Sequence, residues 1–151
     1  MLLVTLLLSY IWASEGVAED LTKVIENSSF LFKVPIEMQE VEVQGIDSFV
    51  KRYESDTIML SFDYGWYSNN FSDWPENTTF EEVEIGGKLA RIGTVKYQFR
   101  DGFPYATQVH FKLDDDVKLS MFAACKTVVD VAIAHGVFGT IVFKDKSPGN
   151  R

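Results

Sequence analysis

The sequence has few of the residues that form disulfides or bind metals. It contains one cysteine, Cys125, and two histidines, His110 and His135. A lone cysteine forms no disulfide within the chain, so the fold must be stable on its hydrophobic core alone. Three Cys and His side chains are too few for a closed zinc site of four such ligands, and we predict no metal and no cofactor. The apolar run LSMFAACKT around Cys125 predicts a buried side chain rather than a nucleophile.

Positive charge is scarce as well. The chain has 14 Lys and Arg against 22 Asp and Glu, a formal net charge of −8, and its basic residues are scattered singly or in pairs. Neutralising phosphates requires clustered Lys and Arg, so we expect no nucleic-acid partner. The surface of an anionic membrane is disfavoured for the same reason. An acidic surface suits solubility, or a cationic partner.

An uncharged apolar run, MLLVTLLLSYIW, opens the chain at residues 1–12. It is shorter than the roughly 20 apolar residues that span a bilayer, and it fits the apolar core of a secretory signal peptide. Ala13, Gly16 and Ala18 follow at the distance of a cleavage site. We therefore predict a signal peptide over 1–18, an exported protein in the periplasm or outside the cell, and no membrane span after its removal.

The alternative for this run is a buried strand or helix at the N-terminus. The run also lacks the Lys or Arg that normally precedes a signal core. A start of the chain upstream of the Met shown is therefore left open.

Aromatic and apolar residues are abundant in the rest of the chain. Hydrophobic residues make up 46% of the sequence, with twelve Phe, six Tyr and three Trp, which excludes a disordered chain. The length favours one domain. We expect a lead-in at 19–29 that is either a short helix or unstructured, a single α+β domain at 30–145, and a polar tail at 146–151.

Alternating apolar residues predict an antiparallel sheet. A hairpin is expected from strands at 48–54 and 57–64, and along its second strand every other residue is apolar, at Ile58, Leu60, Phe62 and Tyr64. Four more strands are separated by turns rich in Gly and Asp. These four are expected at 80–85, 88–99, 103–113 and 117–125. Strands at 30–35 and 38–43 complete the set.

The periodicity changes after the last of these strands. Thr127 and Asp130 fit a helix N-cap and the third residue of a capping box. Apolar residues then recur at helical spacing, and the helix is expected to end either at Gly136 or near Thr140. The predicted fold class is therefore α+β: a mostly antiparallel sheet of six to seven strands with a C-terminal helix packed on one face.

The order of these elements resembles that of a known family. The matching segments are Val34-Pro35, Asp63-Tyr64-Gly65, the run IGGKLARI at 85–92, Cys125-Lys126-Thr127 and residues 140–143. In this order the chain resembles small exported bacterial proteins of the PsbP-like α/β/α sandwich type, over residues 30–143. The resemblance implies a binding or assembly module rather than an enzyme. It transfers no functional residues, because the matching segments build the fold.

A long aromatic loop is the main candidate for a binding site. Residues 65–79, GWYSNNFSDWPENTT, are polar and rich in turn formers. This loop and the strand before it carry five candidate binding residues: Tyr64, Trp66, Tyr67, Phe71 and Trp74. Such rings stack on sugars or anchor a protein partner. The alternative is that two or three of them fold back and cap the sheet.

Other polar clusters have simpler explanations. Asp114-Asp115-Asp116 lacks the spacing of a known calcium loop and predicts a solvated turn. A charged strand face or protected sheet edge is predicted for Glu81, Glu82 and Glu84. The pattern Asn-x-Ser/Thr occurs at Asn27, Asn70 and Asn77, which are glycan acceptors only in a eukaryotic source.

No catalytic set emerges, so we predict a non-enzymatic exported binding or interaction module for an unknown protein or carbohydrate ligand. Both histidines are expected to be structural, with His110 facing away from an apolar stripe and His135 near the helix end. The alternative function is an acidic inhibitor or immunity protein for a cationic toxin or hydrolase. A hydrolase with an unrecognised site would need a deep pocket with convergent polar groups.

Overall fold

Ten strands and one α-helix lie in the part of the chain that the structure describes, residues 21–45, 49–66, 68 and 70–145. The structure is a computed structural model. The predicted signal peptide at 1–18 and the predicted tail at 146–151 lie outside these residues.

The elements follow one another as β1 (Leu21–Glu26), β2 (Phe30–Pro35), β3 (Gln39–Val41), β4 (Phe49–Glu54), β5 (Ile58–Gly65), β6 (Thr79–Ile85), β7 (Lys88–Val95), β8 (Tyr105–Lys112), β9 (Lys118–Cys125), α1 (Val128–Gly139) and β10 (Val142–Phe143). Two short 3-10 helices, η1 (Phe71–Asp73) and η2 (Asp114–Asp116), lie in the connections.

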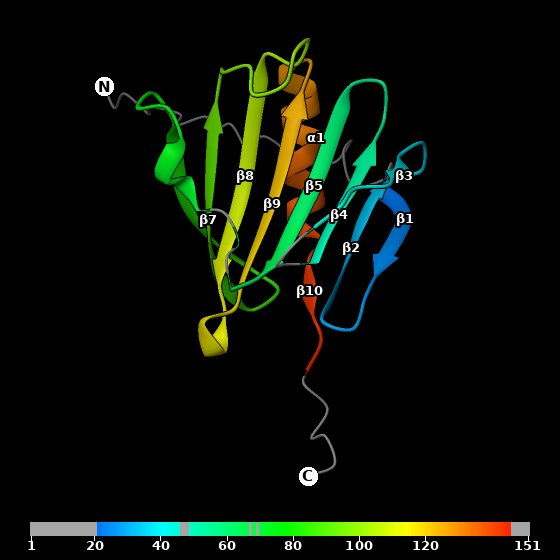
Figure 1. Ribbon diagram of the computed structural model, residues 1–151, viewed down its shortest axis with the longest axis vertical. Helices are drawn as coiled ribbons and strands as arrows, with labels where there is room; N and C mark the ends of the chain where they lie inside the picture. Colours follow the sequence, from blue (N-terminus) through cyan, green and yellow to red (C-terminus); the bar gives the residue numbers. More distant parts are fainter. Residues whose placement is uncertain (1–20, 46–48, 67, 69, 146–151) are drawn as a thin grey trace, which may run out of the picture.

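The strands form two antiparallel sheets (Figure 1). The large sheet has seven strands in the order β3-β4-β5-β9-β8-β7-β6, and the small one has the order β1-β2-β10. Strands β6 to β9 are the predicted meander, and β9 returns to pair with β5 along its whole length. The predicted α+β class, with a seven-stranded sheet and a C-terminal helix on it, is confirmed.

The N-terminal segment corrects one expectation. Residues 21–26, predicted as a short helix or an unstructured lead-in, form strand β1 and pair with β2. The turn between them is held by the Oδ1 atom of Asn27, which accepts hydrogen bonds from the backbone N–H of Ser29 (2.8 Å) and Phe30 (3.0 Å). Local apolar spacing suggested a helix, but pairing with a buried apolar strand decides the conformation.

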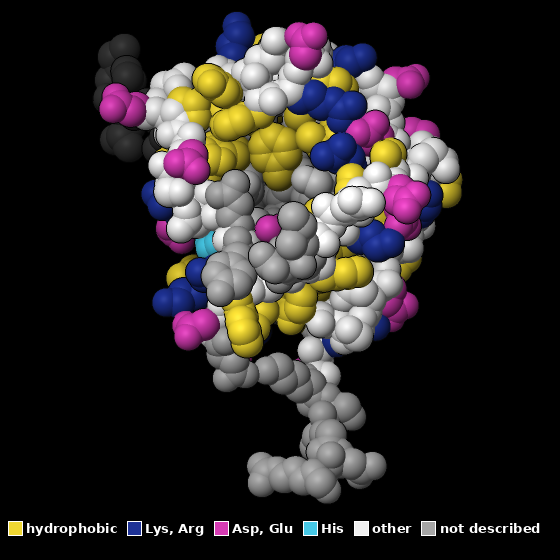
Figure 2. Space-filling view, in the orientation of Figure 1, with side chains coloured by type: hydrophobic (Ala, Val, Ile, Leu, Met, Phe, Trp, Pro, Cys, Tyr) yellow, Lys and Arg dark blue, Asp and Glu magenta, His cyan; other side chains and the backbone are white. Residues whose placement is uncertain are grey.

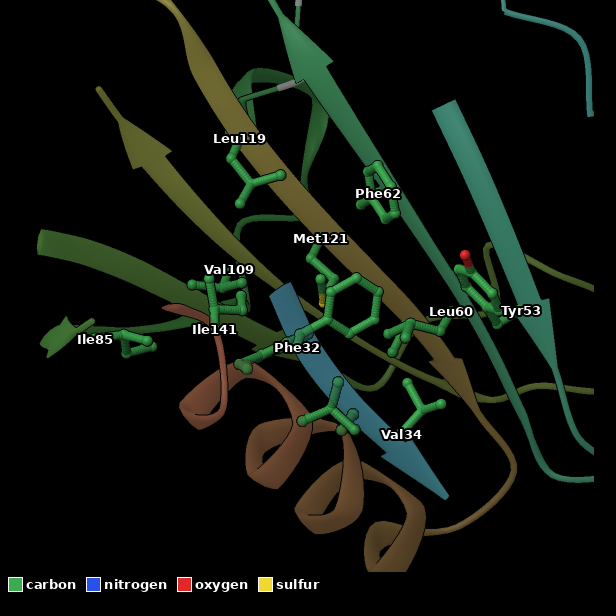
Figure 3. Close-up of a cluster of buried hydrophobic side chains, with 14 of the residues drawn as sticks. Phe32, Val34, Tyr53, Leu60, Phe62, Ile85, Val109, Leu119, Met121 and Ile141 are labelled. Carbon is green, nitrogen blue, oxygen red and sulfur yellow. The ribbon is translucent and has the colours of Figure 1, made fainter. Parts of the chain in front are cut away.

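The core lies between the large sheet and a second layer made by β2 and α1 (Figure 3). We call the face of the large sheet that meets this layer the inner face. Phe30 and Phe32 of β2 are fully buried, and their ring centroids lie 5.1 and 5.7 Å from that of Phe62 on β5. Cys125 is buried here as predicted, and burial raises the pKa of its thiol to about 12, which leaves the sulfur unreactive.

The helix begins at the predicted capping box. The Oγ1 atom of Thr127 accepts from the backbone N–H of Asp130 (3.2 Å), whose carboxylate accepts from the backbone N–H of Thr127 (2.9 Å). Asp130 also accepts a hydrogen bond from the hydroxyl of Thr57 (2.8 Å), which ties the helix to the β4–β5 turn. The helix runs on to Gly139 with Thr140 as its C-cap, so the shorter alternative that ended at Gly136 is wrong.

His135 joins the helix to the inner face of the sheet. Its Nε2 atom lies 2.9 Å from Oγ1 of Thr107 and 3.2 Å from Oγ1 of Thr94. The hydroxyl of Thr107 donates to the carbonyl oxygen of Gly93 (3.0 Å), so it accepts from an Nε2–H group of the histidine. Burial lowers the pKa of His135, and the charge of Glu81 offsets part of that shift.

This lowered pKa makes stability depend on pH. Below about pH 6.5, the ordinary pKa of histidine, the unfolded chain binds a proton at His135 more readily than the folded chain does. We therefore expect the free energy of unfolding to fall as the pH falls below that value. His135→Gln keeps an N–H donor for Thr107 but does not titrate, so its free energy of unfolding should fall less over the same range.

Urea unfolding of both proteins at about pH 7.5 and about pH 5.5 measures this difference. Carboxylates that titrate in the same range affect both proteins equally and cancel in the comparison. An equal loss of stability in wild type and variant would contradict this role of His135.

Candidate functional site

The large sheet has a second face, which points away from β2 and α1 and which we call the outer face. Side chains alternate along a strand, so residues next to core positions point outward. Asp63 on β5, Ser120 on β9 and His110 on β8 are register neighbours on this face. In Figure 1 the helix lies behind the sheet, and Figure 2 therefore shows the outer face, where apolar side chains gather and charged ones surround them.

The aromatic loop folds back onto this face. The ring of Phe71 lies 5.0 Å from Phe80 and 5.1 Å from Trp74, and it covers His110 at a centroid distance of 6.3 Å. Two further rings surround Trp74 on its other side, Phe99 at 5.2 Å and Phe122 at 6.2 Å. The loop therefore caps part of the sheet, which was the alternative expectation for its aromatic residues.

The five predicted binding residues do not share one surface. Tyr64 lies on the inner face, with its ring 5.6 Å from that of Phe30, because it continues the apolar stripe of β5. Trp66 is 67% exposed, and Tyr67 lies outside the described residues. Of the four that the structure describes, Phe71 and Trp74 come together on the outer face.

A hollow of about 350 Å³ opens on the outer face beside Trp74. We call it the outer hollow, and it is lined by Val50, Ser61, Phe62, Asp63, Trp74, Phe99, Gln108, Ser120 and Phe122. Its walls are aromatic, and its floor carries carboxylate, amide and hydroxyl groups from β5, β8 and β9. Among the four predicted residues that the structure describes, Trp74 alone lines the hollow. The outward positions of the strands were a signal in the sequence, but only the strand order brings them together.

Asp63 is the unusual group of the hollow. Its Oδ1 atom is buried and has no hydrogen-bond partner, and none of the ion pairs in the described part of the chain includes it. Two cations lie on neighbouring strands. Arg52 on β4 has a buried Nε atom that is also unpartnered, and Lys118 on β9 donates to the carbonyl oxygen of Trp66 (3.4 Å).

Ser120, which lines the hollow, takes part in a chain of hydrogen bonds. The hydroxyl of Ser68 donates to Oγ of Ser120 (2.7 Å), and Nδ1 of His110 lies 2.7 Å from that same oxygen. In a catalytic triad the histidine lies between the serine and the acid. Here Ser120 lies between Asp63 and His110, and Asp63 forms no hydrogen bond with either. The order of Asp63, Ser120 and His110 therefore differs from that of a Ser-His-acid triad.

The remaining candidates lie elsewhere. The three glutamates predicted at a protected edge are on β6, which is an edge strand of the large sheet, and Glu82 forms an ion pair with Arg91 (3.5 Å). The Asp114–Asp116 run forms η2. In the described ranges, no group of three or more His, Cys, Asp or Glu side chains is placed to hold a metal ion. No helix there is long and apolar enough to cross a membrane.

The three Asn-x-Ser/Thr positions differ in accessibility. Asn70 caps η1 through its Oδ1 atom, and both it and Asn77 are exposed. Asn27 is bound into the β1–β2 turn with its Nδ2 atom buried, so the folded chain does not present that nitrogen to an enzyme. If the source is a eukaryote, glycosylation is compatible with Asn70 and Asn77 alone.

No protein-family model matches the sequence, and no curated protein is significantly similar to it. The resemblance to PsbP-like proteins therefore stays a prediction.

Gly93 on β7 makes the capping of the outer face possible. A Cβ atom at this position would lie 2.6 Å from Cε1 of Phe71 and 3.0 Å from Cε1 of Phe80, which is closer than atoms in contact can approach. Gly93→Ala should therefore displace the loop and lower the free energy of unfolding by about 1–3 kcal/mol, the usual cost of overpacking. Urea unfolding measures this loss.

Gly139→Ala is the matched control, because nothing lies within 4 Å of the added methyl group. Removal of the clashing ring by Phe71→Ala should reduce the cost of Gly93→Ala in the double variant. If Gly93→Ala lowered the free energy of unfolding equally with and without Phe71, the contact between Gly93 and Phe71 would not be what excludes a side chain at this position.

Proposed function

We propose that this protein is a non-enzymatic exported binding module whose ligand occupies the outer hollow. The observation that carries the proposal is a lining that combines aromatic rings with polar side chains, among them Asp63, whose Oδ1 atom has no hydrogen-bond partner. Buried polar groups in proteins are nearly always hydrogen-bonded, so a half-buried carboxylate that lines the hollow and has one buried oxygen without a donor supports a role in ligand binding.

The size of the hollow limits what it holds. A volume of about 350 Å³ is at the small end of the range for ligand pockets. It suits a small molecule, one ring of a saccharide, or a single side chain that protrudes from a protein partner. The outer face therefore supports recognition of one compact group.

Exposed rings extend the hollow at its mouth. Phe99 is 42% exposed and Tyr97 is 49% exposed, with their centroids 4.6 Å apart. Exposed aromatic pairs are common at interfaces, where they supply contact area at low conformational cost. A larger ligand would keep its compact group in the hollow and extend its body over these rings.

Phe99→Ala tests the hollow, with Trp66→Ala as its control. Both side chains are exposed aromatics, but only Phe99 lines the hollow. Saturation-transfer NMR and calorimetry with phenethylammonium, methyl β-glucoside and phenylacetate as probes should find at least one that binds the wild type. Phe99→Ala should weaken that probe about tenfold or more, because it removes the ring that the probe contacts.

Trp66→Ala should leave the affinity unchanged. Phe99→Leu serves as a second variant in case the alanine variant is unstable, since it removes the ring but keeps apolar volume. Absence of binding by every probe, or unchanged affinity in a folded Phe99 variant, would overturn the proposed site.

Export is tested on the full chain in a Gram-negative host. We expect a periplasmic protein whose N-terminus, measured by intact mass, lies just after one of the small residues at Ala13, Gly16 or Ala18. Lys inserted in the middle of the apolar run should block processing, because a charge breaks the apolar core. An intact cytoplasmic chain in the wild type would show that the run is not a signal peptide.

A further inference from the structure

We propose that the outer hollow selects an organic cation, with an ammonium group paired to Asp63 and an apolar body against Trp74, Phe99 and Phe122. This inference rests on the proposed function and adds the chemical class of the ligand. Three features support it: a carboxylate that forms no ion pair with the described residues, aromatic rings that have no cation of those residues over them, and the negative net charge of the chain.

The carboxylate is the first feature. Burying a carboxylate oxygen without a donor or a counter-charge is costly, and the cost disappears when a charged donor arrives. Oδ1 of Asp63 has neither, since Arg52 and Lys118 on the adjacent strands are not within ion-pair distance. An ammonium group brings a positive charge and up to three donors. A neutral hydroxyl brings one donor and leaves the negative charge in place.

The rings are the second feature. Cations bind over the faces of aromatic rings, and this sheet already shows the contact. The guanidinium of Arg91 lies 3.9 Å from the centroid of Phe80, at the far end of the same face. Trp74, Phe99 and Phe122 pack against one another at centroid distances of 5.2 to 6.2 Å. No cation of the described residues lies over these three rings.

The electrostatic field of the whole chain is the third feature. The formal net charge is −8, so the chain attracts cations and repels anions before contact. In the lining of the hollow, the hydroxyl oxygen of Ser61 can accept a hydrogen bond. The polar side chains of the lining also suit a neutral saccharide. The negative charge of Asp63 favours the cation, because Asp63 takes part in none of the ion pairs of the described residues.

The test compares two probes that differ only in the head group. Phenethylammonium and 2-phenylethanol share a phenyl ring and an ethyl chain, and one carries an ammonium group where the other has a hydroxyl. By calorimetry on the full chain at low salt, we expect the wild type to bind the ammonium probe about tenfold or more tightly than the alcohol. Methyl β-glucoside is the saccharide probe.

Asp63→Asn removes the charge and keeps the shape of the side chain. It should weaken the ammonium probe by about ten- to a hundredfold and change the affinity for the alcohol by less than about threefold. Asp56→Asn is the control: Asp56 is exposed in the β4–β5 turn, so its variant has the same net charge without touching the hollow. It should bind both probes as the wild type does. Because Asp63→Asn removes an unpaired charge, its melting temperature should not fall.

The outcomes separate this inference from the proposed function. Two results would overturn the preference for a cation: equal affinity for both phenyl probes, or a higher affinity for the glucoside, in either case unchanged by Asp63→Asn. The outer hollow would then remain as a site for neutral ligands. An equal loss of affinity for the ammonium probe in Asp63→Asn and Asp56→Asn would overturn the role of the Asp63 carboxylate, because the net charge of the chain would then explain the preference. No binding of any probe would overturn both proposals.

Discussion

The packing of β2 against the inner face of the large sheet is the contact on which the rest of the structure depends. Phe30 and Phe32 are fully buried against Phe62, and the same strand holds β1 on one side and β10 on the other. Together with α1 this layer covers one face of the sheet (Figure 3). Over the opposite face, the described residues place the aromatic loop and Phe99, with the outer hollow beside them.

Much of this fold was predictable because it depends on local patterns. Alternating apolar residues identified β5, β8 and β9, and the capping box located the start of α1. The predictions failed at β1 and at the end of β7, where the local pattern does not decide the structure. β1 was expected as a helix or a lead-in because its spacing is ambiguous, and its pairing with β2 depends on tertiary context. The strand predicted at 88–99 ends at Val95, and the residues after it bring Phe99 to the hollow.

The candidate site was predictable only in part, for a related reason. Loop composition indicated the aromatic residues, and the structure assigns them different roles: Trp74 lines the hollow, Phe71 caps the sheet, Tyr64 joins the core and Trp66 is exposed. Gln108 and Ser120 lie on β8 and β9, consecutive strands of the predicted meander, whereas Asp63 lies on β5, much earlier in the chain. Nothing in the chain indicates that β5 lies beside β9, so their meeting could be seen only in three dimensions. The acidic inhibitor hypothesis stays a prediction.

The small sheet also constrains when the protein can fold. Its central strand β2 lies near the start of the described chain, but its partner β10 comes after α1, and the backbone N–H of Lys33 bonds to the hydroxyl of Thr140 across 107 residues. Contacts of this separation form late and slowly, because a long loop must close first. A ribosome or a translocation channel that still holds the last residues therefore holds an incomplete core. This delay keeps the small sheet, and the part of the core that it covers, incomplete until β10 has joined β2.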